Sequence, residues 1–192
     1  SVTGVQTCAL PIPVIAAPTA AHAALAVPLL RAGISCLVEK PLAATEADIA
    51  AMIAAAREGN AVLQVGHVER FNPAVETLLA AAIAPKAIRA IAARRMSAAS
   101  ARVTDIDVVT DLMVHDLDVV LALKGGDVCG VQAAGNDDHA VALLRFADGG
   151  VATLTASRLT ATRTRDLDVT DDDAFFHLDY IARTVTRTLK RG

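Results

Sequence analysis

The chain has 192 residues, a net charge of −3 and an aromatic content of 3%. This length allows one good-sized domain or two small ones with a sizeable core. A nucleic-acid-binding protein needs a basic face and, for single strands, aromatic stacking surfaces, and this composition offers neither. The three cysteines, Cys8, Cys36 and Cys129, are odd in number and too widely spaced for a disulfide framework or a zinc site. We therefore expect a protein of the reducing cytoplasm that binds no nucleic acid.

The N-terminal segment combines two unusual features. Residues 1–12 have no helical or strand period, and residues 2–12 read like the translation of a sequencing-library adaptor. We expect residues 1–12 to be an artefact of sequence assembly, with a natural N-terminal segment as the alternative. Residues 8–30 contain no Asp, Glu, Lys or Arg and are long enough to span a membrane. Four prolines and His22 interrupt this stretch, so we expect no membrane helix and no signal peptide.

From Pro13 the chain alternates between short apolar runs and helical patterns. The predicted strands cover residues 13–17, 34–38 and 61–66, and a helix is predicted over 21–33. A second helix is predicted between Thr45, its N-cap, and Gly59, with acidic residues in its first turn. Strands that alternate with helices indicate βαβ units and a parallel sheet, so this part belongs to the α/β class.

The pattern changes after Arg70. Helices are predicted over 72–84 and 108–126, and a strand over 86–96. Five further runs have the spacing of hairpin strands: 127–134, 139–146, 150–158, 163–169 and 174–180. Several such strands beside a few helices indicate an α+β domain with a mostly antiparallel, open sheet. We place the boundary between the two parts near residues 66–72.

Polar residues follow each of the three predicted parallel strands. The first strand ends at Pro18-Thr19, with His22 close behind; the second ends at Glu39-Lys40-Pro41. The third ends at Gly66 and is followed by residues 67–70, which include a histidine, a glutamate and an arginine. Ligands of open parallel sheets bind beyond the carboxyl ends of the strands, so these residues are candidates for a binding rim. The alternative is that the ends of strands are polar in any protein.

Asp111 and His115 are four residues apart on a predicted helix and should therefore share one face. Apolar residues separate them, which is expected where a core helix reaches a cleft. A histidine has an unperturbed pKa of about 6.5, which suits general acid–base chemistry near neutral pH. The alternatives are an exposed polar pair, or a pair of metal ligands completed by Asp118.

Four segments occur in an order that resembles a known family: VIAAPTAAH, VEKPLA, VGHVERFNP and DLMVHDLD. Together they resemble the Gfo/Idh/MocA family of NAD(P)-dependent oxidoreductases, from Pro13 to at least Tyr180. Members of this family begin with a strand and a G-x-G-x-x-G phosphate loop, which the 192 residues do not contain. The acidic residue that follows the family's second strand is also absent, and the chain ends within the sheet domain.

The resemblance implies a specific domain organisation. Residues 13–69 would be the C-terminal part of a Rossmann-like dinucleotide-binding domain. Residues 70–192 would be a C-terminally truncated α+β domain for substrate binding and oligomerisation. We expect the 192 residues by themselves to be inactive, because pyrophosphate binding relies on the missing glycine-rich loop.

The resemblance also implies roles for individual residues. His115 would be the general base that takes a hydroxyl proton, while Asp111 would hold that hydroxyl or orient the imidazole. Lys40 would hold the reacting oxygen, and its bond to Pro41 is a candidate for the cis form. The implied contacts to NAD or NADP are Pro18, Thr19, His22, Glu39, Lys40 and Pro41. The implied contacts to substrate are Arg70, Asn72 and Asp111, although Arg70 could equally form an ordinary ion pair; no metal is implied.

The predicted function is hydride transfer between NAD(P) and a hydroxyl of a sugar, a nucleotide sugar or a cyclitol, with UDP-N-acetylglucosamine 3-dehydrogenases as the most similar branch. Lys40, Asp111 and His115 should then converge on one cleft. Family sheets of this kind often pack face to face, so a homodimer or homotetramer is expected. One alternative is a non-catalytic homologue that binds a sugar nucleotide. Another is a metal-dependent hydrolase that uses Asp111, His115 and Asp118.

Overall fold

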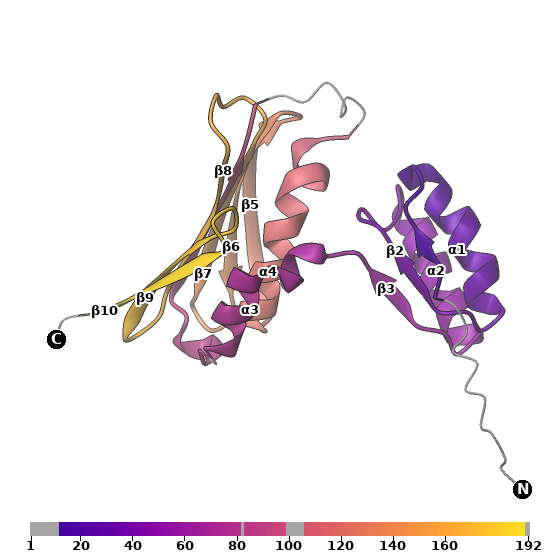
Figure 1. Cartoon of the computed structure of the whole chain (residues 1–192), viewed down its shortest axis with the longest axis horizontal. Coiled ribbons are helices and arrows are strands. Elements are labelled where there is room, and N and C mark those ends of the chain that lie inside the picture. Colours follow the sequence, from indigo (N-terminus) through magenta and orange to yellow (C-terminus); the bar gives the residue numbers. More distant parts are fainter. Residues whose placement is uncertain (1–11, 82, 99–105, 191–192) are drawn as a thin grey trace, which may run out of the picture. The chain divides into compact units, whose positions relative to one another are not determined.

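The computed structural model describes residues 12–81, 83–98 and 106–190. The predicted artefact therefore lies outside the described residues, except for Ile12. Contacts within the chain divide it into two units, residues 1–67 and 68–192, and each is described by itself (Figure 1). None of the described helices is both long enough and apolar enough to cross a membrane.

The smaller unit is a three-stranded parallel sheet covered by two helices. Its elements are β1 (Val14–Ile15), α1 (His22–Arg31), β2 (Cys36–Val38), α2 (Glu46–Glu58) and β3 (Leu63–Val65), with a short 3₁₀ turn, η1 (Thr19–Ala21), before α1. The strands lie in the order β1-β2-β3, so the predicted βαβ arrangement is confirmed. Thr45 is the N-cap of α2, because its hydroxyl oxygen accepts a hydrogen bond from the amide of Asp48 (3.1 Å). A core of small and aliphatic side chains, such as Leu30, Val38 and Met52, joins helices to sheet.

The sequence pattern only partly predicts the helical elements of the larger unit. They are η2 (Val68–Phe71), α3 (Pro73–Ala80), η3 (Pro85–Ala87), η4 (Val109–Met113) and α4 (Val114–Lys124). The helix predicted over 72–84 ends early at Ala80. The helix predicted over 108–126 starts as the π-helical turn η4 and continues as α4. A left-handed Gly125, with φ of 54°, ends α4.

A seven-stranded sheet forms the rest of the larger unit. Its strands are β4 (Ala90–Met96), β5 (Val128–Asn136), β6 (His139–Phe146), β7 (Val151–Ser157), β8 (Thr164–Thr170), β9 (Ala174–Asp179) and β10 (Thr184–Leu189). They lie in the order β10-β9-β8-β4-β7-β6-β5, and only the β4–β7 pair is parallel. The predicted antiparallel sheet is confirmed. Strand β10 was missed, because its threonines alternate with Val185, Arg187 and Leu189, and the charge of Arg187 interrupts the apolar pattern.

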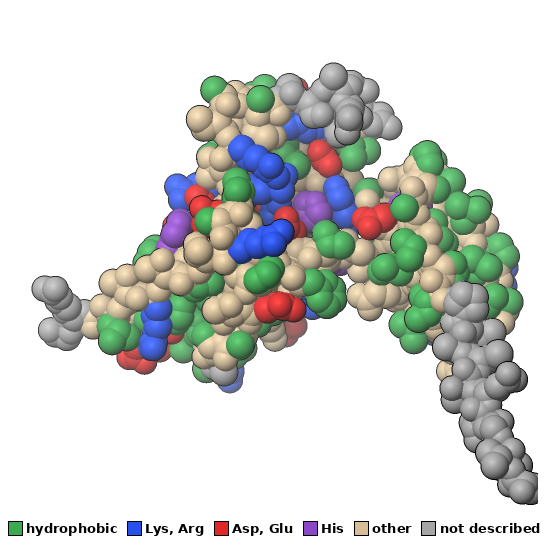
Figure 2. All heavy atoms as spheres, in the orientation of Figure 1, with side chains coloured by type: hydrophobic (Ala, Val, Ile, Leu, Met, Phe, Trp, Pro, Cys, Tyr) green, Lys and Arg blue, Asp and Glu red, His purple; other side chains and the backbone are tan. Residues whose placement is uncertain are grey.

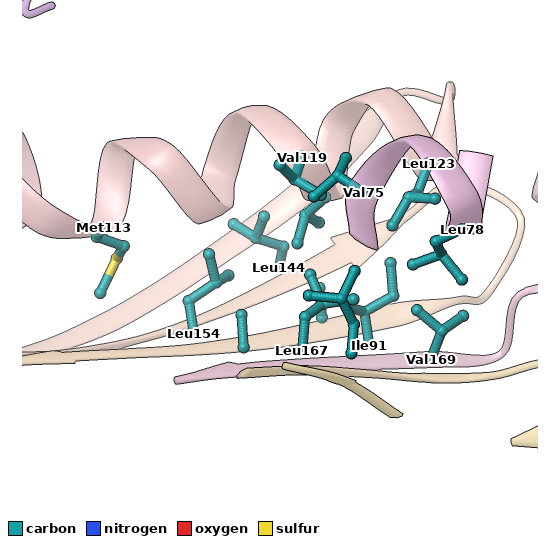
Figure 3. Packing of buried hydrophobic residues seen from close by; sticks show 14 of the residues in the cluster. Val75, Leu78, Ile91, Met113, Val119, Leu123, Leu144, Leu154, Leu167 and Val169 are labelled. Carbon is teal, nitrogen blue, oxygen red and sulfur yellow. The ribbon is translucent and has the colours of Figure 1, made fainter. Parts of the chain in front are cut away.

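Helices α3 and α4 pack on one face of this sheet (Figure 1). Figure 3 shows Val75 and Leu78 of α3, and Val119 and Leu123 of α4, above a layer of strand side chains. That layer includes Ile91, Leu144, Leu154, Leu167 and Val169. Side chains alternate between the two faces of a strand, so the residues between these core positions point to the opposite face.

Candidate active site

The carboxyl ends of the three strands in the smaller unit form one polar edge. The amide of Glu39 donates a hydrogen bond to the last residue of β1 (2.9 Å), and the amide of Gly66 donates one to the last residue of β2 (2.7 Å). A Cβ atom on Gly66 would lie 3.2 Å from the Glu39 carboxylate, so this side chain lies against the end of β3. Lys40 and Pro41 follow, and the peptide bond between them is cis, as predicted. The predicted rim residues of β2 and β3 are therefore neighbours.

His22 lies beneath this edge and not on it. Its side chain is buried, with a relative exposure of 1%. The ring Nδ1 lies 3.1 Å from the carbonyl oxygen of Pro41 and 3.2 Å from that of Leu42, and Nε2 lies 2.8 Å from that of Ala17. The ring thus connects the end of β1 to the loop after β2. His22 therefore supports the Lys40–Pro41 loop, and a direct contact between His22 and the cofactor remains a prediction.

On the larger unit, Asp111 and His115 line one pocket of about 280 Å³. The other lining residues are Ser97, Ala98, Leu112, Arg158 and Arg165. Asp111 lies in the π-helical turn η4, and His115 lies in the first turn of α4. The two side chains share one face, as their four-residue spacing predicted, and their catalytic roles remain a prediction. Single π-helical turns are frequent at functional sites, because they change the direction in which a side chain leaves a helix.

Asp107 fixes the start of the π-helical turn that carries Asp111. Its Oδ1 accepts hydrogen bonds from the amides of Val109 and Thr110 (both 2.9 Å), and its Oδ2 accepts one from the Thr110 hydroxyl (2.8 Å). Burial alone would raise the pKa of Asp107, and the hydrogen bonds from Thr110 and Val109 lower it below its usual value. The ionised carboxylate of Asp107 therefore caps the start of η4, the turn that carries Asp111.

Arg158 contacts Asp111 from the strand side of the pocket. Its side chain is 7% exposed. The Nη2 atom donates a hydrogen bond to the carbonyl oxygen of Ile106 (2.7 Å) and lies 3.6 Å from Asp111 Oδ2, while Nη1 lies 3.7 Å from Asp138 Oδ1. The Arg158 guanidinium therefore lies against the Asp111 carboxylate and limits its rotation.

A buried ion-pair network lies beside His115. Arg95, which is 1% exposed, donates to both carboxylate oxygens of Asp116 (2.9 and 2.8 Å) and to Oε1 of Glu69 (2.9 Å). Its guanidinium also lies over the ring of Tyr180, 5.0 Å from the centroid. Burial would raise the pKa of Glu69, but Arg95 outweighs it, and with His115 holds that pKa below its usual value. The histidine therefore has an ionised carboxylate in its electrostatic surroundings.

Two predicted substrate residues of this unit have other contacts. Arg70 forms a bidentate ion pair with Asp118 (2.6 and 2.7 Å), which is the ordinary ion pair given above as the alternative role of Arg70. Asn72 is the N-cap of α3 and donates to the carbonyl oxygen of Tyr180 (3.1 Å). A direct substrate contact by Arg70 or Asn72 remains a prediction.

Two of the three side chains of the alternative metal site lie against arginines. Asp118 is engaged by Arg70, whereas Asp111 lies near Arg158. Within residues 12–81, 83–98 and 106–190, no three His, Cys, Asp or Glu side chains are grouped so that they could hold a metal ion. The set of Asp111, His115 and Asp118 is therefore not assembled as a metal site.

Sequence reasoning missed Arg158 and Arg165, and it included Glu69 only as one of the rim residues after the third predicted strand. Glu69 lies inside the quoted segment VGHVERFNP but was not singled out. A usable signal existed for Arg165, because it has the same strand parity as Leu167 and Val169, which are core residues. A charged residue at a core-facing position is a candidate functional residue.

Two family models match the two parts of the chain. Residues 9–67 match the model described as oxidoreductase family, NAD-binding Rossmann fold, and residues 85–176 match the GFO/IDH/MocA C-terminal domain. The chain belongs to the Gfo/Idh/MocA family. Its Rossmann-like part and its mostly antiparallel sheet are those of the family's dehydrogenases, as predicted.

Two curated members of the Gfo/Idh/MocA family are similar to this chain over most of its length. A UDP-N-acetylglucosamine 3-dehydrogenase from Acidithiobacillus ferrooxidans is 35% identical over 177 residues, which are 89% of this chain and 56% of that protein. The myo-inositol dehydrogenase Hyg17 from Streptomyces leeuwenhoekii is 29% identical over 163 residues, 75% of this chain and 50% of that protein. The chain thus spans about half the length of the curated relatives it matches.

Solved structures of the family agree in fold. A structure of the A. ferrooxidans enzyme has a TM-score of 0.86 at 34% identity, covering 92% of this chain and 60% of that one. The WlbA dehydrogenase from Bordetella pertussis, solved in complex with NADH and UDP-GlcNAcA, has a TM-score of 0.81 at 20% identity, covering 93% and 59%. The second likeness concerns the fold alone.

Proposed function

We propose that this protein is an NAD(P)-dependent dehydrogenase that oxidises a hydroxyl of a sugar, and that its substrate is a nucleotide sugar such as UDP-N-acetylglucosamine. The observation that carries the proposal is the pocket in which Asp111 and His115 lie together beside an ionised Glu69. The 35% identity to a UDP-N-acetylglucosamine 3-dehydrogenase supports the choice of substrate over a cyclitol. A non-catalytic homologue would not need a base and a carboxylate in one pocket.

The smaller unit fits the nicotinamide end of a dinucleotide. The carboxyl ends of β2 and β3 present Glu39 and Lys40 side by side with Gly66, whose missing Cβ leaves room for the Glu39 carboxylate. Ligands of open parallel sheets bind at this edge. The proposed contacts are Pro18, Thr19, Glu39, Lys40 and Pro41. Bound NAD(P) would supply the acceptor for the hydride.

His115 takes the proton of the reacting hydroxyl in the proposed mechanism. Asp111, held by Arg158, accepts a hydrogen bond from the substrate and fixes its orientation. Lys40 approaches the same oxygen from the cofactor side, and its ammonium stabilises the negative charge that develops as the proton leaves. It is part of this proposal that Lys40 reaches the substrate bound in the pocket of the larger unit.

We propose the remaining features of the parent protein on separate grounds. Residues 13–69 form its partial dinucleotide-binding domain and residues 70–192 its substrate domain. A homodimer or homotetramer forms through the sheet face opposite α3 and α4, where Val141 (41%), Val151 (37%) and Phe175 (38%) are exposed. A Val141→Lys variant with lower mass in light scattering would support this interface. Cys36 and Cys129 form no disulfide, which supports a cytoplasmic location.

The proposed activity is tested with the full gene product. Purified protein is incubated with NAD or NADP and with UDP-N-acetylglucosamine, free N-acetylglucosamine or myo-inositol, and reduced cofactor is followed by its absorbance. We expect reduction with the nucleotide sugar at a higher kcat/KM than with the other two. Absence of reduction with all three substrates and both cofactors would overturn the proposal.

A further inference from the structure

The substrate pocket contains an arginine that differs from its neighbours in its contacts. Arg165 lies in β8 on the same face as Leu167 and Val169, is half-buried and lines the pocket with Asp111 and His115. Figure 2 shows the wider setting, in which Lys and Arg side chains gather on one face of the larger unit, with His side chains among them.

Three arginines in β4 or directly before it are each bound to a carboxylate. Arg89 pairs with Asp172, Arg94 with Asp166, and Arg95 with Asp116. Among the residues that the structure describes, Arg165 has no hydrogen bond or ion pair from its side chain. A guanidinium carries five N–H donors in a planar fork that matches a carboxylate or a phosphate. Partial burial without such a partner is costly.

Charges around Arg165 do not supply this partner. Arg95 lies directly opposite it in the β4–β8 register, and Arg163 adds a second positive charge. Glu69 and Asp116 attract Arg165, but both carboxylates are hydrogen-bonded to Arg95. Burial and the two arginines together lower the pKa of Arg165 below its usual value.

Arg158 is the other cation of the pocket and is already committed. Its Nη2 donates to the carbonyl oxygen of Ile106, and the guanidinium lies near Asp111 and Asp138. Arg158 therefore positions Asp111, whereas Arg165 lines the pocket without such contacts.

We propose that Arg165 binds an anionic group of the substrate through its paired N–H donors, and so makes this pocket specific for charged sugars. The inference rests on the proposed function, because it assigns the substrate class of the same site. A phosphate of a nucleotide sugar and a carboxylate of a sugar acid offer the same acceptor geometry.

The test compares variants at Arg165 with a matched arginine two residues away. Arg165→Met removes the charge and keeps much of the volume, Arg165→Lys keeps the charge without the fork, and Arg163→Met is the control at an exposed position. Equilibrium binding to the purified 192-residue chain is measured for UDP-N-acetylglucosamine, glucuronic acid and myo-inositol. The far-ultraviolet circular dichroism of each variant checks that it is folded.

We expect Arg165→Met to weaken binding of one anionic probe by roughly 10- to 100-fold, the usual effect of losing hydrogen bonds to a charged group. Arg165→Lys should lie between wild type and Arg165→Met, and Arg163→Met should bind as wild type. The probe that loses most identifies phosphate or carboxylate as the source. Equal losses for myo-inositol, or no loss for either anion, would overturn the inference.

The same variants separate this inference from the proposed function. In the full gene product, Arg165→Met should raise KM for a charged substrate and change kcat much less. Arg165-dependent binding of an anion without any cofactor reduction would contradict the dehydrogenase proposal and leave the anion site standing. Cofactor reduction by Arg165→Met with the same KM and kcat as wild type would contradict the anion site and leave the dehydrogenase proposal standing.

Discussion

Arg95 and Arg165 lie directly opposite each other on the antiparallel strands β4 and β8. Like charges at this position of a ladder repel, and Arg95 is stabilised by two carboxylates that come from outside the sheet, Asp116 of α4 and Glu69 of η2. Arg95 therefore links the helices to the sheet, while Arg165 faces the pocket. One cross-strand pair thus serves both the structure and the proposed site.

Replacement of Arg95 should destabilise the larger unit strongly. In Arg95→Met, the carboxylate of Asp116 would stay buried at 2% exposure without its partner. Breaking a buried pair from one side costs roughly 3–5 kcal/mol. Urea unfolding of the 192-residue chain, followed by circular dichroism, measures this loss. Arg94→Met is the matched control, because the exposed Arg94–Asp166 pair contributes about 1 kcal/mol or less; equal losses in the two variants would contradict the role of Arg95.

Stability of the larger unit should fall in acid partly through Glu69. Its pKa in the folded protein is lowered, despite burial, chiefly by Arg95. An ionised Glu69 therefore stabilises the fold above its unfolded pKa of about 4.3, and this contribution is lost as the pH falls through the lower folded value. Glu69→Gln should be less stable at neutral pH and lose less between neutral pH and about pH 3. Glu76→Gln, exposed on α3, should retain the wild-type slope.

Removal of the His22 ring should weaken the smaller unit. His22→Ala leaves the carbonyl oxygens of Ala17, Pro41 and Leu42 without a buried partner. We expect a loss of roughly 2–3 kcal/mol, since one unsatisfied buried group costs about 1–3 kcal/mol. Hydrogen exchange of amides in α1 and α2 reports on this unit. Leu25→Ala, at an exposed position of the same helix, should cost much less; similar protection in both variants would refute the support role.

Loss of the proposed base should abolish most turnover. In the full gene product, His115→Ala should lower kcat by roughly 10²- to 10⁴-fold, the usual contribution of a positioned acid–base group. Steady-state reduction of the cofactor with UDP-N-acetylglucosamine gives this value. His177→Ala is the control, because His177 lies between the core residues Phe176 and Leu178 and therefore points to the other face of the sheet, where it pairs with Asp168. Turnover that is unchanged in His115→Ala would remove this residue from the mechanism.

The local signals in the sequence predicted most of the fold. Apolar runs that alternate with helical periods predicted the parallel sheet of the smaller unit, and Thr45 marked the start of α2. The four-residue spacing of Asp111 and His115 placed them at one pocket, although a π-helical turn carries the first of them. These predictions depend on neighbours within one or two turns of the chain, which the sequence order itself specifies.

Contacts between distant residues were decided only by the tertiary structure. Arg95 and Asp116 are 21 residues apart and Arg70 and Asp118 are 48 apart, and no local pattern selects one carboxylate among the many available. His22 has the spacing of a rim residue, yet the fold closes the loop after β2 over its ring. The sequence by itself therefore determined the order and type of elements, since these follow from local periodicity. Packing across the fold decides which charges are neutralised by a partner and which line a pocket, and Arg165 lines the pocket.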